Sequence, residues 1–180
     1  ITNYYYNNFD KKGTISKITH DRQIVTYEYD DLLRPISICE KISNDTYTTD
    51  ISYDEASRVS DKTYPSGYMV KYDYYDNGIL KSISDSDDNI LWQVDDINAR
   101  GQIMQSTTGN GATTNYTYDT KGRLIRNVTS NNINNFSYTY DKFANLASRS
   151  DSVVHNRREL FEYDNLNRLT RSYSNNSVLN

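Results

Sequence analysis

Apolar and polar residues alternate along most of the chain in short runs, and clusters of turn-forming residues separate these runs. In Tyr116-Thr-Tyr118, two rings two positions apart point to the same side of an extended strand, because side chains alternate between the faces of a β-strand. The same spacing recurs at Tyr27/Tyr29, Tyr72/Tyr74 and Tyr138/Tyr140. No segment shows a long apolar period of the helical kind. The pattern therefore predicts short β-strands joined by turns, with no stable helix.

A tight turn follows each of these strands. In the most complete copy, Tyr118 is followed by Asp119-Thr-Lys-Gly122-Arg123-Leu124. The Asp side chain can accept hydrogen bonds from the turn backbone, and Gly supplies the positive φ that a three-residue hairpin loop with a bulge requires. Self-similarity at a fixed period is typical of repeat proteins. Aligned on the Asp position, eight copies recur about every 22 residues, at Asp10, Asp30, Asp54, Tyr75, Asn98, Asp119, Asp141 and Asp164.

The loop length fixes which residues face each other across each hairpin. If the three residues between Asp119 and Arg123 form the loop, Asp119 faces Arg123 on one side of the sheet, and Tyr118 faces Leu124 on the other. The alignment then predicts an apolar pair in every copy except Tyr29/Pro35, at Phe9/Ile15, Tyr53/Val59, Tyr74/Leu80, Ile97/Ile103, Tyr118/Leu124, Tyr140/Leu146 and Tyr163/Leu169. Four copies also predict an ion pair, at Asp30/Arg34, Asp54/Arg58, Asp119/Arg123 and Asp164/Arg168.

The two kinds of pair are expected to contribute differently. Burying one Tyr or Leu side chain stabilises a fold by about 1.5 to 3 kcal/mol, which is more than an exposed ion pair contributes. Hydrophobic pairing is therefore expected to hold the array together, and the ion pairs to fix its register. Two copies lack both charges. Tyr75 and Asn98 replace the Asp of the motif in these copies, and Ile79 and Gln102 replace the Arg.

A second set of turns separates the units, marked by Tyr64-Pro-Ser-Gly67, Gly109-Asn-Gly111 and the Asn-rich stretch 131–135. Strands and turns that alternate about every 11 residues give about 16 short antiparallel strands, more than an open twisted sheet carries without curling. We therefore predict an all-β fold in which residues 1–180 form a single array of tandem antiparallel β-hairpins in a curved or spiralling sheet. Since Ile1 already lies in repeat-like sequence, we expect a fragment of a longer protein.

Composition sharpens this picture. The chain has 18 Tyr among 180 residues but only 36% apolar residues, so Tyr must replace much of the usual aliphatic core. A formal net charge of -4 argues against a nucleic-acid-binding surface, which needs clustered Lys and Arg. No apolar run approaches the roughly 20 residues that span a bilayer, and no export signal opens the chain. Cys39 is the only cysteine, which excludes an internal disulfide.

Candidate chemistry is sparse. Asp85-Ser-Asp87-Asp88-Asn89, followed by Gln93 and Asp96, spaces oxygen atoms as a calcium-binding loop does, but Ile90 stands where that loop requires Gly. An ordinary acidic turn is the favoured interpretation, although calcium binding stays open. His20 and His155 stand apart from any nucleophile. We therefore predict no catalytic residue, no metal ligand and no cofactor.

Aromatic residues outside the repeat pattern are the best candidates for ligand contact. Tyr68, Tyr75 and Trp92 do not occupy the core positions of the repeat, so their rings are freer to stack on a sugar or to form a flat contact surface. Tyr118 and its equivalents alternate with polar residues and are expected to form the core instead. Glycans or surface receptors are therefore candidate partners.

The unit Tyr-x-Tyr-Asp-x-x-Gly-Arg-Leu, complete at 116–124 and partial at 27–34, 72–80 and 161–169, resembles the YD-repeat or RHS-repeat family. Its members include bacterial RHS polymorphic toxins, shell components of Tc insecticidal toxins, wall-associated proteins and teneurins. The resemblance implies a β-hairpin ribbon that spirals into a hollow shell, often around a C-terminal toxin domain, or that is displayed at the cell surface. The self-cleaving Asp-Pro motif with which many family shells end is not present in this chain.

These observations favour a non-catalytic structural segment of a secreted or cell-surface, bacterial RHS-type protein. Its expected partners are other repeats or a toxin domain of the same parent protein, and exposed sheet edges invite edge-to-edge self-association. An adhesion or carbohydrate-binding repeat module is the alternative, motivated by the surplus rings. Scattered carboxylates are the only feature that an enzyme could use, so we predict that the chain is not an enzyme.

Overall fold

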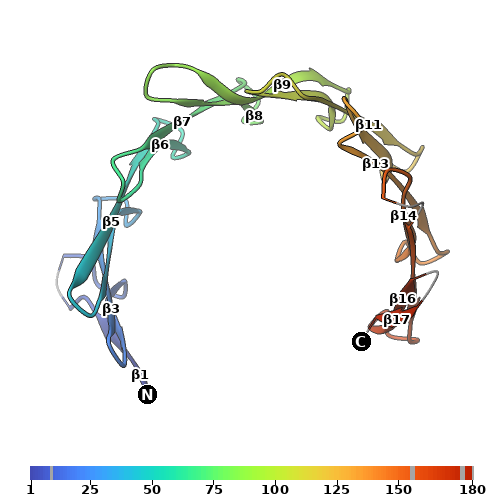
Figure 1. Ribbon diagram of the computed structural model, residues 1–180. Helices are drawn as coiled ribbons and strands as arrows, with labels where there is room; N and C mark the ends of the chain where they lie inside the picture. Colours follow the sequence, from blue (N-terminus) through green and yellow to red (C-terminus); the bar gives the residue numbers. More distant parts are fainter. Residues whose placement is uncertain (9, 155–156, 175–176, 180) are drawn as a thin grey trace. The chain divides into compact units, whose positions relative to one another are not determined.

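The computed structural model describes residues 1–8, 10–154, 157–174 and 177–179. Within these residues the regular structure consists of seventeen β-strands and no helix, as the two-residue periodicity predicts. No helix of the described chain is long and apolar enough to cross a membrane. The chain divides into two compact units, Ile1–Leu91 and Trp92–Asn180. The strands of each unit follow one another in chain order (Figure 1).

The first unit is an antiparallel meander in which each strand pairs with the next along the chain. Its strands are β1 (Thr2–Tyr6), β2 (Ile15–His20), β3 (Gln23–Tyr29), β4 (Pro35–Ile42), β5 (Asp45–Tyr53), β6 (Val59–Thr63), β7 (Met69–Tyr74) and β8 (Leu80–Asp85). A turn at Asp85–Asn89 follows β8, and in it the amide of Asp85 donates to the carbonyl of Asn89 over 3.0 Å.

The second unit repeats the same antiparallel arrangement. The boundary between the two units falls within strand β9 (Ile90–Ile97), which belongs to the second unit from Trp92 onward. The strands that follow are β10 (Ile103–Thr108), β11 (Thr113–Tyr118), β12 (Leu124–Thr129), β13 (Asn134–Tyr140), β14 (Leu146–Asp151), β15 (Arg157–Tyr163), β16 (Leu169–Ser174) and β17 (Ser177–Leu179). Both units are therefore the hairpin arrays that the repeat predicts.

The predicted facing pairs form in all but the first copy. Tyr118 lies opposite Leu124, with a bulge just before it at Thr117/Tyr118. The corresponding pairs are Tyr29/Pro35, Tyr53/Val59, Tyr74/Leu80, Ile97/Ile103, Tyr140/Leu146 and Tyr163/Leu169. Pro35 is tolerated because it is the first residue of β4, where its missing N–H costs least.

The first copy differs from the prediction. Ile15 lies opposite Tyr6 in the ladder between β1 and β2, whereas Phe9 was the expected partner and lies outside the described residues. The loop is longer here, because the hydrogen bond that closes it joins the amide of Asn7 to the carbonyl of Thr14. The Asp10 anchor is therefore misplaced: Asn7, not Asp10, starts this turn.

The turns depend less on Gly than the motif suggests. Gly122 has the expected positive φ of 85° at the third position after Asp119. Non-glycine residues take the same conformation in four other copies, at Leu33, Ser57, Ala144 and Asn167. The same hydrogen-bonded turn also joins one repeat to the next, at 64–68, 85–89 and 108–112. One turn geometry therefore serves both kinds of connection.

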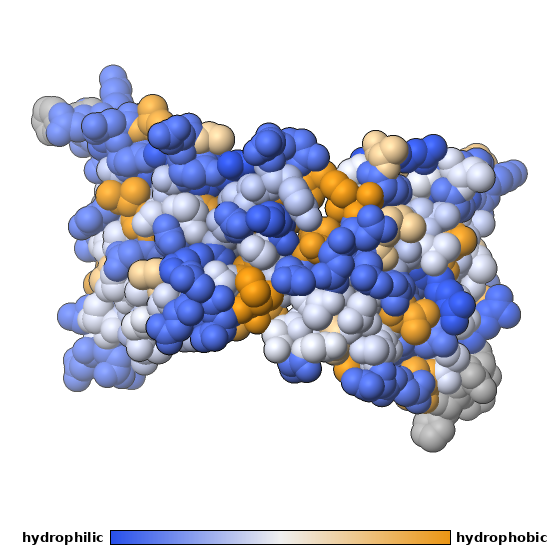
Figure 2. Space-filling view, turned by 90° about the horizontal axis from the view of Figure 1, so that it is seen from above, coloured by the Kyte–Doolittle hydropathy of each residue, from blue (hydrophilic) through white to orange (hydrophobic). Residues whose placement is uncertain are grey.

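The apolar core is thin. Val70, Val94 and Ala112 are the hydrophobic residues that are buried in the described chain. Most of the paired rings and aliphatic side chains, Tyr118 and Leu124 among them, are half-buried. Hydrophilic residues cover much of the face seen in Figure 2, with apolar residues in small patches between them. Stability must therefore come from contacts between neighbouring hairpins as well as from burial.

Candidate functional site: the junction between hairpins

An Asp carboxylate organises the turn in the most complete copies. Asp119 accepts hydrogen bonds at Oδ1 from the amides of Lys121 and Arg123, both over 2.9 Å. Its Oδ2 accepts a third from the Arg123 Nε over 2.7 Å. The hydrogen bond from the Arg123 amide holds the pKa of Asp119 below its usual range, against a smaller opposing effect of desolvation. The carboxylate therefore satisfies two turn amides and fixes the Arg side chain at once.

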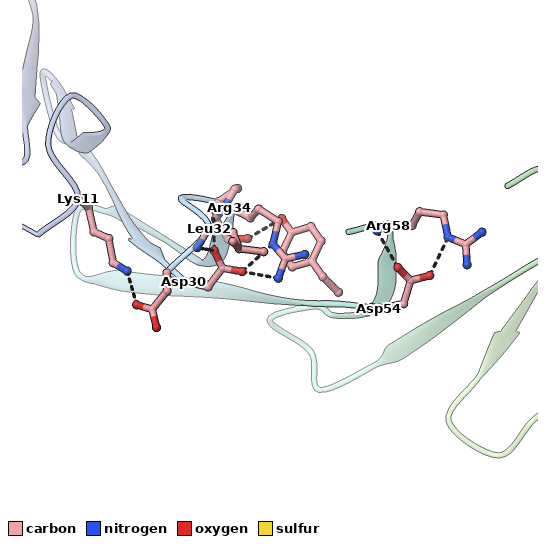
Figure 3. A network of polar contacts seen from close by, with 9 residues as sticks. Lys11, Asp30, Leu32, Arg34, Asp54 and Arg58 are labelled. Atoms are coloured by element: carbon pink, nitrogen blue, oxygen red, sulfur yellow. Dashed lines mark hydrogen bonds and ion pairs between the residues drawn. The ribbon is translucent and has the colours of Figure 1, made fainter. Parts of the chain in front are cut away.

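All four predicted ion pairs form. Asp30 with Arg34 and Asp54 with Arg58 are visible in Figure 3, together with Lys11, whose Nζ lies 2.7 Å from Oδ1 of Asp31. The remaining two are Asp119/Arg123 and Asp164/Arg168, each with a nitrogen–oxygen distance of 2.7 Å. As with Asp119, a hydrogen bond from the amide of the paired Arg lowers the pKa of Asp54 and of Asp164.

Three of these arginines reach the next hairpin. The guanidinium carbon of Arg34 lies 4.4 Å from the centre of the Tyr53 ring, and that of Arg58 lies 4.4 Å from the Tyr74 ring. In the second unit, Arg123 lies 4.7 Å from the ring of Tyr140. A cation over an aromatic face contributes about 0.5 to 1 kcal/mol at exposed sites. Each of the three therefore links the carboxylate of its own turn to the ring of the following repeat.

Arg168 belongs to the last complete repeat of the described residues and forms its predicted ion pair with Asp164. Its side chain is 73% exposed, whereas that of Arg123 is only 26% exposed. Leu169 lies opposite Tyr163, as the facing pairs predict, and is 56% exposed. The ring of a following hairpin that covers Arg34, Arg58 and Arg123 has no counterpart among the described residues after Arg168.

The Tyr hydroxyl before each turn binds back to the preceding hairpin. The hydroxyl of Tyr74 donates to the carbonyl of Val59, the residue after Arg58, over 2.9 Å. The other five bonds are Tyr29 to Ile15 (2.7 Å), Tyr53 to Pro35 (2.8 Å), Tyr118 to Ile103 (2.9 Å), Tyr140 to Leu124 (2.8 Å) and Tyr163 to Leu146 (3.1 Å). Desolvation raises the pKa of Tyr118 and of Tyr140, in keeping with their half-buried positions.

Sequence reasoning missed both links between hairpins. The alignment identified Tyr53 and Tyr118 as core rings and gave no role to their hydroxyls. The signal that could have revealed it is the strict choice of Tyr, rather than Phe or Leu, before six of the eight turns. A hydroxyl retained at a half-buried position indicates a hydrogen-bond acceptor.

The copy at Asn98 keeps the turn without charges. Asn98 Oδ1 accepts from the amides of Arg100 and Gln102, and its Nδ2 donates to Oε1 of Gln102 over 3.0 Å. Gln102 in turn donates to the carbonyl of Gly122, in the next hairpin, over 2.7 Å. A neutral Asn/Gln pair therefore replaces the Asp/Arg pair contact for contact within this turn.

The acidic turn at 85–89 uses its first carboxylate in the same way. Asp85 Oδ1 accepts from the amides of Asp87 and Asn89, and Oδ2 accepts from the Asn89 side chain. The hydrogen bond from the Asn89 side chain lowers the pKa of Asp85. Asp88 forms an ion pair with Lys71 over 2.7 Å. In the part of the chain that the structure describes, no three His, Cys, Asp or Glu side chains are grouped to hold a metal ion.

The structure does not gather the predicted ligand-contacting rings. Tyr68 is 46% exposed and precedes β7, whereas Tyr75 is half-buried and follows it. Strand β7 lies between them, so their backbones are seven residue steps apart, about 23 Å at 3.3 Å per residue. Trp92 is half-buried in β9. Tyr64, which the prediction omitted, is 37% exposed and closes a turn with Tyr68.

The structure describes one of the two histidines. His20 ends β2, where its Nδ1 lies 2.8 Å from the Thr2 hydroxyl and its Nε2 lies 3.4 Å from the Asp21 carboxylate. His155 lies outside the described residues.

Comparison with known proteins adds three findings. Residues 98–132, which hold the Asn98 turn and strands β10 to β12, match the family model described as RHS Repeat. No curated protein matches the chain. The chain is similar in structure to several solved complexes, each match covering 95% of this chain: TcdB2-TccC3-Cdc42 (TM-score 0.70, 15% identity), TcdB2-TccC3 (0.69, 16%) and the Tc holotoxin pore of Photorhabdus luminescens (0.68, 16%).

This likeness concerns the fold. The chain spans 10% of the length of each of these toxin chains, and the identities are low. The antiparallel hairpin array predicted from the repeat is thus a fold that these solved structures contain.

Proposed function

We propose that this chain, an array of RHS repeats, is a structural, non-catalytic wall segment of a longer secreted or cell-surface protein. The observation that carries the proposal is the junction between hairpins. Asp54, Arg58 and Tyr74 direct their polar groups at the turn or at the neighbouring hairpin. The most distinctive side chains of the repeat thus join one hairpin to the next, as the wall of a shell requires.

The wall encloses a toxin domain of the same bacterial parent protein. Two observations support this finer proposal: the repeat match at 98–132 and the fold shared with TcdB2-TccC3-Cdc42 and with the Tc holotoxin pore. Because the chain spans a tenth of those toxin chains, residues 1–180 form one array that continues into further repeats in the parent.

The coding sequence on either side of this segment tests the proposal first. We expect further Tyr-Asp repeats and, beyond them, a domain without the repeat. A parent that contains neither contradicts the toxin-shell version.

A protection experiment on the parent protein is the sharper test. A protease site placed in the non-repeat domain is expected to resist cleavage in the native protein and to be cut after denaturation. The same site placed in an exposed turn of the array, such as 64–68, serves as the control and is expected to be cut in the native protein. Equal cleavage at both sites excludes enclosure.

A carbohydrate-binding or adhesion module is the second candidate function. It is favoured by the exposed rings of Tyr64 and Tyr68, which flank one turn and offer a stacking surface for a sugar. On a glycan array, Tyr68→Ala is expected to abolish retention. Tyr47→Ala removes an equally exposed ring (44%) elsewhere and serves as the control. A folded chain that retains no glycan contradicts this candidate.

A further inference from the structure

Two arginines and two serines form a row across four strands of the second unit. Arg126 of β12 lies opposite Ser137 of β13, Ser137 opposite Ser150 of β14, and Ser150 opposite Arg158 of β15. Residues that face each other in a ladder share one side of the sheet. The Tyr138 and Tyr140 rings lie at alternate positions of β13 and hence on the other side. The row is therefore separate from the junction described above.

The row lines a shallow hollow of about 510 Å³, together with Asn135, Asp151 and Ser152. Both Nε and Nη2 of Arg126 donate to Oδ1 of Asn135 over 3.2 Å, which holds this guanidinium along the hollow. The only carboxylate in the lining belongs to Asp151, and its Oδ1 accepts from the amide of Val153 over 2.9 Å. In the ladders Asp151 lies opposite Phe136 and Arg157, at positions that alternate with those of the row. The row therefore presents two positive charges, in a chain whose net charge is -4.

Donors in this hollow lack protein partners. No hydrogen bond or ion pair joins the side chains of Ser137, Ser150 or Arg158 to another residue in the described part of the chain. A polar group without a protein partner is available to a ligand.

The spacing suits an oxyanion. Three steps between neighbouring strands separate the Arg126 and Arg158 backbones by about 14 Å. Each Arg side chain can reach roughly half of that distance, so both guanidinium groups can approach an anion above Ser137 and Ser150. A guanidinium group matches the paired oxygens of a carboxylate, phosphate or sulfate, and serine hydroxyls add donors. No aromatic residue lines the hollow to stack on a neutral sugar.

We propose that this row, Arg126, Ser137, Ser150 and Arg158, binds the oxyanion group of an anionic ligand. Charge pairing within the fold argues against the neighbouring hollow, which Phe136, Arg149, Arg157 and Glu159 line on the opposite face. There, the buried Glu159 carboxylate pairs with both arginines, and Asp151, opposite Arg157 in the ladder, adds a second carboxylate to the lining. The two guanidinium groups of that hollow are therefore balanced by two carboxylates.

Nuclear magnetic resonance of the 180-residue chain tests the site directly. The Nε–Hε signals of its arginines are followed during titration with sodium sulfate, inorganic phosphate, a sulfated oligosaccharide and its unsulfated counterpart. Signals of Arg126 and Arg158 are expected to shift with the anions and not with the neutral sugar. Shifts with sulfate or phosphate alone identify a site for free anions, whereas shifts with the sulfated sugar alone identify a site for an anionic group carried on a glycan; either result supports the row.

Matched variants make the test specific. Arg158→Gln is expected to weaken binding about tenfold, the equivalent of about 1.4 kcal/mol, and Ser137→Ala/Ser150→Ala to weaken it about threefold. Arg22→Gln removes the same charge at an exposed site in the first unit and is expected to leave affinity unchanged. The amide spectrum of each variant verifies that the fold is retained. Absent shifts at Arg126 and Arg158, or equal weakening by Arg22→Gln, overturn the proposal.

Discussion

Arg58 places its guanidinium carbon 4.4 Å from the centre of the Tyr74 ring, while the Tyr74 hydroxyl donates to the carbonyl of Val59, the residue next to that Arg. Two contacts therefore join the same two hairpins, one through the ring and one through its hydroxyl. Since few hydrophobic side chains in the described chain are buried, such contacts carry a larger share of the stability than in a domain with a thick core.

The ring and hydroxyl contributions can be separated at Tyr74. Tyr74→Phe keeps the ring under Arg58 and removes the hydrogen bond to Val59, so we expect it to lower the free energy of unfolding by about 1 kcal/mol. Tyr74→Leu also removes the ring and is expected to cost about 1 kcal/mol more. Urea unfolding monitored by circular dichroism measures both. Tyr47→Phe, at an exposed ring, is the control, and a loss there as large as at Tyr74 contradicts the argument.

The hydrogen bonds that the Asp119 side chain accepts should stabilise its turn more than its negative charge does. Asn98 shows that an amide oxygen can accept from both turn amides. We therefore expect Asp119→Asn to lower the melting temperature by less than about 2 °C and Asp119→Ala to lower it by roughly 2–4 °C. Calorimetry of the two variants measures the difference. Equal effects would mean that the ion pair with Arg123, which both variants lose, outweighs the turn hydrogen bonds.

Stability should fall at acid pH. The pKa values of Asp54, Asp119 and Asp164 are lowered in the folded chain, with hydrogen bonds from the paired Arg amides as the largest cause. An Asp whose folded pKa lies below the unfolded value of about 3.9 contributes stability above that value and loses it as pH falls through the folded pKa. We expect a urea midpoint that is flat from about pH 5 to 7 and declines below about pH 4. Replacing all three with Asn is expected to make the decline smaller, since the pKa of Asp85 is lowered as well and its contribution remains. An unchanged decline would assign it to other carboxyl groups.

The sequence predicts contacts within one hairpin better than contacts between hairpins. Tyr118 and Leu124 are six residues apart, so one loop length fixes their pairing, and the sequence was sufficient. The bond from Tyr74 to Val59 depends on how adjacent hairpins are staggered, which no single unit encodes. The Asp164/Arg168 ion pair, by contrast, lies within one turn, and the motif was sufficient to predict it.

The prediction for the first copy failed because the loop between Asn7 and Thr14 is longer than the loop of the motif. The Arg126 to Arg158 row was hidden in another way. Its four residues come from four strands, and only the register of three successive ladders brings them onto one face. Arg126 is three residues beyond Arg123 in the sequence, yet Arg123 belongs to a turn and Arg126 to the hollow. Residue type and spacing alone therefore could not separate their roles.

Positive φ at the third turn position provides a test of backbone strain. Gly122 has φ 85°, and a Cβ there would lie 2.9 Å from Nη1 of Arg100, whose Nη2 donates to the carbonyl of Thr120. Gly122→Ala is therefore expected to cost about 1 kcal/mol or more from strain and from displacing Arg100. Gly78 has a similar φ of 86°, but a Cβ there would lie 4.0 Å from its nearest neighbour. Gly78→Ala therefore measures the cost of backbone strain without a clash.

Ala144 provides the reverse experiment, because it already holds φ 68°. Ala144→Gly relieves the left-handed strain but gives the unfolded chain more freedom, and since the strain of roughly 1–2 kcal/mol exceeds the entropic loss, we expect a net gain of about 0.5 kcal/mol. Urea unfolding of the three variants is expected to rank them Ala144→Gly, Gly78→Ala, Gly122→Ala from most to least stable. If Gly122→Ala and Gly78→Ala are equally stable, Arg100 yields without cost and backbone strain alone explains the preference for Gly at this position.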